Sequence, residues 1–223
     1  DPDFCSVERQ ANMSREEMLE LFRSDDGQDP MPALDLHLEQ ARDYGRDMLA
    51  LNLTPQLVLQ KALASSEPLQ TFMDILDQVA GYNEDPLRKK PGLLALILNQ
   101  RPEKFLPLRE DEQIPPVIDY HLIRSALRTG LVDVLGQALE EKLKGRWLVT
   151  AVEEWAVRYP SYQAIEQLVA LSGRRSDFVD SFFFNARRYC PEMSDPQCAE
   201  CQVNSACVRR TELFQPVLRT TFY

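Results

Sequence analysis

Apolar residues recur at helical spacing along most of the chain. In residues 68–82 the apolar side chains share one face of a helix: Leu69, Phe72, Met73, Leu76 and Val79. This i, i+3, i+4, i+7 pattern predicts an amphipathic helix, and Gly81 is its expected end. The pattern predicts further helices over 120–130, 131–143, 147–159, 161–173 and 176–189. The sequence therefore predicts an all-α fold.

Several helix boundaries carry their own signals. Ser14 followed by Glu17 has the spacing of a capping box, and Thr54 followed by Pro55 is typical of an N-cap and first helical position. The run "GLLALIL" (92–98) is apolar all round, which predicts a helix buried on every side. Residues 101–117 form the longest predicted connection, and long ordered loops are often functional.

Charge is distributed unevenly along the chain. Of its 223 residues, the first 85 hold 18 acidic and 6 basic residues, whereas residues 86–223 hold 17 acidic and 19 basic ones. The net charge of −10 therefore belongs to the N-terminal third, which we expect to dock a protein partner or to cover a basic face. The rest of the chain can present a basic face to phosphates. We expect three parts, an acidic helical part (1–85), a helical core (86–189) and a cysteine loop with tail (190–223), in a cytoplasmic monomer without membrane contact.

Four of the five cysteines lie in the segment "CPEMSDPQCAECQVNSAC", with the spacing C-x7-C-x2-C-x5-C: Cys190, Cys198, Cys201 and Cys207. Disulfides are disfavoured because the remaining chain is typical of a large, well-cored intracellular protein. Structural zinc usually takes two C-x2-C pairs, and only one is present. Unequal arms favour a [4Fe–4S] cluster, with zinc and disulfides as the alternatives.

This segment resembles the C-terminal C-x6-C-x2-C-x5-C loop of the endonuclease III and MutY-type DNA glycosylases of the helix–hairpin–helix superfamily, with one extra residue in the first arm. In that family the cluster stiffens a loop whose basic residues contact the DNA backbone. The resemblance implies phosphate contacts from the flanking arginines, Arg187, Arg188, Arg209 and Arg210. Surface ion pairs are the alternative role for each of them.

A second resemblance lies around Asp119. The run "IPPVIDYHLIRSALRTG" is similar to the aspartate segment of the archaeal 8-oxoguanine DNA glycosylase branch, in which a lysine, an apolar helix and a proline-rich loop come first. The resemblance implies Lys90 as nucleophile and Asp119 as the carboxylate that stabilises charge on the sugar or acts as acid and base. Lys89, His121 and Asp180 are further pocket candidates. The alternatives are that Asp119 is only an N-cap and that the lysines form a solvated basic cluster.

These resemblances imply an enzyme that cleaves the N-glycosidic bond of a modified or damaged base in DNA, with AP-lyase activity if the lysine lies in the pocket. The "LPGVG"-like hairpin usual in the superfamily is absent. That absence and the acidity favour a second hypothesis, a nucleoside or nucleotide N-glycosidase of the queuosine-salvage type. A third is a non-catalytic iron–sulfur binding module. A steep salt dependence of duplex binding is expected only where DNA is bound.

Overall fold

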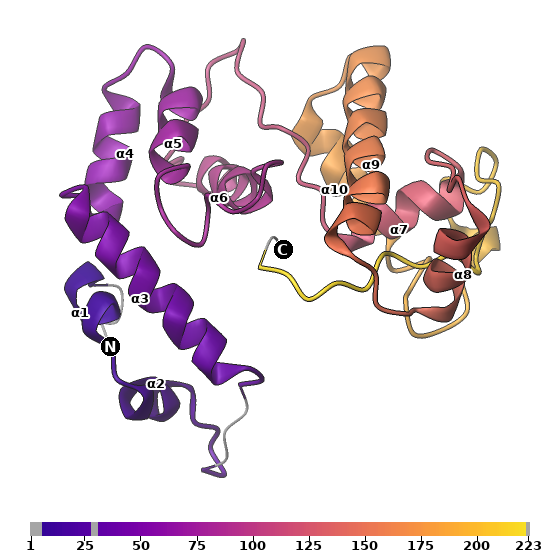
Figure 1. Cartoon of the computed structure of the whole chain (residues 1–223). Coiled ribbons are helices and arrows are strands. Elements are labelled where there is room, and N and C mark those ends of the chain that lie inside the picture. Colours follow the sequence, from indigo (N-terminus) through magenta and orange to yellow (C-terminus); the bar gives the residue numbers. More distant parts are fainter. Residues whose placement is uncertain (1–5, 28–30, 222–223) are drawn as a thin grey trace. The chain divides into compact units, whose positions relative to one another are not determined.

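The computed structural model describes residues 6–27 and 31–221. The chain forms two compact units (Figure 1). The N-terminal unit consists of residues up to 86 together with 97–112, and the C-terminal unit consists of 87–96 together with the residues from 113 onward. Each unit is described by itself below.

The N-terminal unit is built from helices that pack in pairs. They are α1 (Val7–Asn12), α2 (Arg15–Phe22), α3 (Leu34–Ala50), α4 (Pro55–Leu63) and α5 (Pro68–Leu76). α1 and α2 both contact the long α3, and α4 packs on α5 (Figure 1). Gly45 of α3 makes the first contact possible, because a Cβ there would lie 2.3 Å from the backbone nitrogen of Ala11. A side chain at this position would therefore force α1 away from α3.

The predicted helix starts of this unit are confirmed. The Ser14 side chain accepts from the backbone N–H of Glu17, and the Thr54 side chain accepts from that of Leu57. The predicted end at Gly81 is wrong, because α5 stops at Leu76. The N–H of Ala80, which a continued helix would use internally, donates instead to the carboxylate of Asp47 at 2.8 Å. The helical pattern has already changed at Gln78, whose N–H donates to the carbonyl of Ile75, and the tertiary hydrogen bond of Ala80 follows that change.

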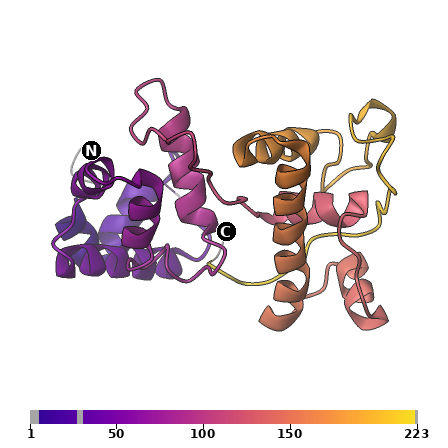
Figure 2. The same ribbon diagram turned by 90° about the horizontal axis from the view of Figure 1, so that it is seen from above.

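The C-terminal unit contains the beginning of α6 (Lys89–Gln100) and four further α-helices, α7 (Tyr120–Thr129), α8 (Gln137–Gly145), α9 (Ala151–Ser172) and α10 (Ser176–Ala186). α7 and α10 pack on α9 and on each other (Figure 2). Their apolar faces form one core, which includes Ile118, Leu122, Leu127, Ile165 and Phe183. From the end of α10 to residue 221 the chain is non-helical except for the short 3-10 helix η2 (Cys198–Glu200).

Three predictions for these helices are wrong in detail. Residues 147–173 contain one helix, α9, with Pro160 inside it, rather than two helices. Its buried residues Val157, Ser161 and Ile165 continue past Pro160, so packing against one core outweighs the hydrogen bond that proline cannot donate. Residues 131–136 are not helical, and α8 begins only after Gly136, whose φ is +116°.

The third concerns α6, which is a helix as predicted but is not buried on every side. It buries Pro91, Gly92, Ala95 and Leu96, whereas Ile97 is 47% exposed.

The all-α prediction is confirmed for the described residues, whose only β contact is an isolated bridge between Leu148 and Val217. The predicted connection over residues 101–117 lies outside helices, as the sequence indicated. Within the same described residues, no helix combines the length and the apolar character that crossing a bilayer requires.

Candidate functional site

The four cysteines of the 190–207 segment surround one cavity. Cys190, Cys198, Cys201 and Cys207 all line it, each is half-buried, and none is in a disulfide. The cavity measures about 40 Å³ and is closed by residues of α7 and α10, among them Arg128 and Phe183. The structure therefore brings together all four residues that the spacing singled out.

Backbone hydrogen bonds attach this cysteine loop to the end of α7. The N–H of Val208 donates to the carbonyl of Thr129 at 3.3 Å, and that of Arg210 donates to the carbonyl of Arg128 at 3.1 Å. Gly130 ends α7 at a φ of +82°, and a Cβ there would lie 2.6 Å from a methyl group of Val208. Glycine at this position thus permits both the turn and the close approach of the loop.

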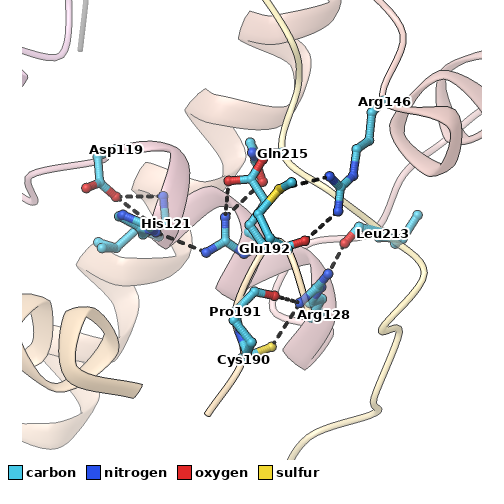
Figure 3. Close-up of polar contacts among 12 residues, drawn as sticks. Asp119, His121, Arg128, Arg146, Cys190, Pro191, Glu192, Leu213 and Gln215 are labelled. Atoms are coloured by element: carbon cyan, nitrogen blue, oxygen red, sulfur yellow. Dashed lines mark hydrogen bonds and ion pairs between the residues drawn. The ribbon is translucent and has the colours of Figure 1, made fainter. Parts of the chain in front are cut away.

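A buried arginine contacts a cysteine sulfur directly. Arg128 is 2% exposed, and its Nη1 donates to the Sγ of Cys190 at 3.2 Å and to the carbonyl of Pro191 at 3.0 Å (Figure 3). Its Nε donates to the carbonyl of Leu213 at 2.9 Å. A guanidinium cannot lose its proton in a protein, so a fixed positive charge lies beside this sulfur.

The thiols also influence one another. Burial raises the pKa of Cys207, the N–H of Arg209 opposes that rise, and negative charge on the other three cysteines raises the pKa further. All four sulfurs are therefore close enough to interact electrostatically. Among the described residues, however, no three Cys, His, Asp or Glu side chains lie close enough together to hold a metal ion.

Asp119 lies at the opposite end of α7. It is the N-cap, with extended backbone, and its Oδ1 accepts from the N–H groups of His121 at 2.8 Å and Leu122 at 2.9 Å (Figure 3). The second carboxylate oxygen takes no part in the cap. Two N–H donors and the helix N-terminus stabilise the negative charge of Asp119.

A polar network leads from His121 towards the cysteine loop. Arg124, 2% exposed, contacts the Nδ1 of His121 at 3.0 Å, the Oε1 of Gln215 at 3.0 Å and the carboxylate of Glu192 at 3.3 Å. Because a guanidinium only donates, Nδ1 of His121 must accept, which leaves the imidazole proton on Nε2. Burial is the main cause that lowers the pKa of His121, and the charges of Arg124 and Arg187 lower it further, whereas Asp119 and Glu192 raise it.

Asp180 of α10 is the second carboxylate of this region. It is 8% exposed, and its Oδ1 has no hydrogen-bond partner within the described structure. Burial, and then the charge of Asp119, raise its pKa to about 7; Lys89 lowers it and Asp177 raises it. Lys89, Asp119 and Asp180, from three different elements, are therefore electrostatic neighbours.

The two candidate lysines differ in their surroundings. Lys89 is the first residue of α6 and acts on Asp180, whereas Lys90 is not among the charges that shift the pKa of Asp180. Both side chains are half-buried. Lys89, unlike Lys90, is therefore close enough to Asp180 to influence its charge.

The four predicted phosphate-binding arginines have different environments. Arg210 is ion-paired with Asp133, and Arg187 lies over the ring of Phe184 at 3.5 Å. Arg188 donates to the carbonyl of Asn185 at 3.2 Å and, like Arg209, is exposed. Arg188 and Arg209 are therefore the more available of the four.

No protein-family model and no curated protein matches this chain. The residues of this chain therefore carry the functional assignment. Sequence reasoning missed Arg128 and Glu192 and gave Arg124 no role. The available signal was a pair of arginines four residues apart in the otherwise largely apolar stretch 122–128, where a charged side chain needs a partner.

Proposed function

We propose that this protein is an N-glycosidase of the helix–hairpin–helix glycosylase type, which removes a modified or damaged base from DNA. The observation that supports this most is the grouping of Lys89, Asp119 and Asp180, contributed by α6, the N-cap of α7 and α10. A buried carboxyl with a raised pKa beside an anion and an amine is typical of acid–base sites. The all-α fold agrees with this family, whereas the missing glycine hairpin is a departure from it.

Each of the three groups has a task that its surroundings favour. Asp119, held by two N–H donors, stabilises the positive charge that develops on the sugar as the bond to the base breaks. Lys89 supplies the amine that attacks the C1′ of the sugar in the lyase reaction. Asp180, with a pKa of about 7, can accept the proton that the Lys89 ammonium must lose before it attacks.

The cysteine loop fits a [4Fe–4S] cluster by the chemistry of its donors. Four thiols without disulfides line one cavity, and a fixed guanidinium lies on one sulfur. Cys190, Cys198, Cys201 and Cys207 would hold the cluster, which stabilises the loop when bound.

Borohydride trapping on a duplex with an abasic site tests the amine assignment. Borohydride reduces a Schiff base between a lysine and the sugar to a stable covalent adduct. We expect the adduct with the wild type and with Lys90→Ala, and its loss with Lys89→Ala. Lys90→Ala is the matched control because it removes the adjacent amine from the same helix turn.

Two results would contradict this assignment. Loss of the adduct in Lys90→Ala alone would show that Lys90 is the nucleophile. Absence of an adduct in every variant would show that the protein has no lyase activity. If, in addition, the wild type and Asp119→Asn release no base from damaged duplexes, the non-catalytic module replaces the glycosidase.

A further inference from the structure

The outer face of α10 carries two hollows that the proposed chemistry does not use. One, of about 320 Å³, lies between α10 and the cysteine loop and is lined by residues that include Phe178, Phe182, Asn185, Tyr189 and Gln202. The other, of about 350 Å³, shares Phe178 and Phe182 with the first and is mainly apolar. Both volumes fall within the range of about 300–1,000 Å³ typical of small-ligand sites. We call the two hollows together the α10 groove.

The groove presents aromatic rings that are exposed or half-buried. Phe178 is 57% exposed, and Phe182 and Tyr189 are half-buried. Two amides lie beside the rings. Asn185 donates its Nδ2 to the carbonyl of Ser181 at 2.8 Å, which leaves its Oδ1 as an acceptor, and Gln202 is exposed. Ring faces next to amides suit flat ligands with polar edges, as nucleobases are.

Arginine side chains lie close to these rings. Arg174 lies 5.5 Å from the centre of the Phe178 ring, and Arg188 lies 5.6 Å from that of Tyr189. Among the described residues no carboxylate forms an ion pair with either of these two guanidinium groups. Their positive charge is therefore available to an anionic ligand, and the alternation of rings and cations is typical of surfaces that bind single strands.

We propose that the α10 groove binds the unpaired bases of single-stranded DNA. Bases stack on Phe178 and Tyr189, and Arg174 and Arg188 pair with the phosphates. The proposal rests on the proposed function for its choice of DNA, because extruding a nucleotide from a duplex leaves unpaired bases beside the site. It adds a second contact surface, separate from the carboxylate and lysine group.

Fluorescence anisotropy with a short labelled oligothymidylate at low salt tests this proposal. We expect Phe178→Ala to weaken binding by about 5- to 150-fold, since stacking on one aromatic ring contributes this much per base. Leu171→Ala is the matched control, because Leu171 is an 86% exposed apolar residue that lines neither hollow, and it should bind as the wild type does. Arg188→Gln should reduce the slope of log affinity against log salt by about 0.7.

The binding measurements distinguish the groove proposal from the proposed glycosidase function. Asp119→Asn, which we expect to abolish base release, should bind oligothymidylate as tightly as the wild type. If no base release is found but Phe178→Ala still weakens binding, the glycosidase proposal fails and the groove stands. If the wild type binds no oligothymidylate, or if Phe178→Ala binds as tightly as the wild type, the groove proposal is overturned whatever the enzymatic result.

Discussion

Asp180 has an environment that ordinary protein carboxylates avoid. A buried charge is costly unless it is paired, and an orphan oxygen adds to that cost. The Oδ1 of Asp180 has no partner within the described structure, and the charge of Asp119 opposes ionisation further. Only Lys89 favours the charged form. A residue that stays buried despite such an energetic cost is often functional, so Asp180 belongs with Asp119 in the candidate site.

This environment predicts a pH-dependent effect of Asp180→Asn on stability. The folded carboxyl keeps its proton up to a pH of about 7, whereas the unfolded one loses it near its ordinary pKa of 3.8. The wild type therefore loses stability from this group as the pH rises from about 4 to about 7, and the loss is constant above that. The variant lacks this titration, so its free energy of unfolding should increase relative to the wild type over the same range, by up to about 4 kcal/mol.

Urea unfolding followed by tryptophan fluorescence measures this difference, because Trp147 and Trp155 both lie in the C-terminal unit. Asp25→Asn is a control in the N-terminal unit, where the side chain is exposed. A stability difference between Asp180→Asn and the wild type that stays constant from pH 4 to pH 7 would refute the assignment.

At the scale of elements, the sequence predicted the helices and their caps but not every place where tertiary contacts override local signals. Ser14, Thr54 and Gly130 act locally, and their helix boundaries were correct. α5 ends early, and beyond its last turn Asp47, distant in sequence, accepts the N–H of Ala80. α9 passes through Pro160 because its buried face continues on both sides of the proline. Spacing predicted which cysteines belong together, whereas no local pattern could show that Lys89 rather than Lys90 is the neighbour of Asp180.

The proposed [4Fe–4S] cluster should stabilise the cysteine loop. We expect the protein purified without air to be brown, with broad absorption near about 400 nm, and to contain iron and sulfide. Removing the iron with a chelator should lower the melting temperature, because metal binding contributes to folding. Cys198→Ser should lose the absorption, whereas Ser205→Ala in the same loop should keep it. Stoichiometric zinc without iron would contradict the cluster.

At the scale of the whole molecule, the two units carry opposite net charge. The N-terminal unit holds 22 acidic and 9 basic residues, and the C-terminal unit holds 13 acidic and 16 basic residues. The net charges are therefore −13 and +3. All the candidate residues lie in the basic unit, so the overall acidity does not argue against a nucleic-acid partner. Phosphate binding depends on the local charge at the contact surface.

The salt dependence of duplex binding should therefore distinguish neighbouring arginines. Arg209 is exposed and no carboxylate in the described structure pairs with it, whereas Arg210 is ion-paired with Asp133. We expect Arg209→Ala to reduce the slope of log affinity against log salt by about 0.9, the contribution of one phosphate contact. Arg210→Ala should have a smaller effect. An unchanged slope in Arg209→Ala would exclude this contact, and binding without salt dependence would favour a free nucleoside as substrate.

The ends of α7 impose a constraint on how this chain can vary. Asp119 caps the first turn, and Arg128 reaches the sulfur of Cys190 from the last turn. Each residue added to a helix rotates the next part of the chain by about 100° and moves it by about 1.5 Å. One inserted or deleted residue would therefore leave either the carboxylate or the guanidinium in place, but not both. The number of residues that separates Asp119 from Arg128 is therefore fixed, and the buried residues between them are constrained as well.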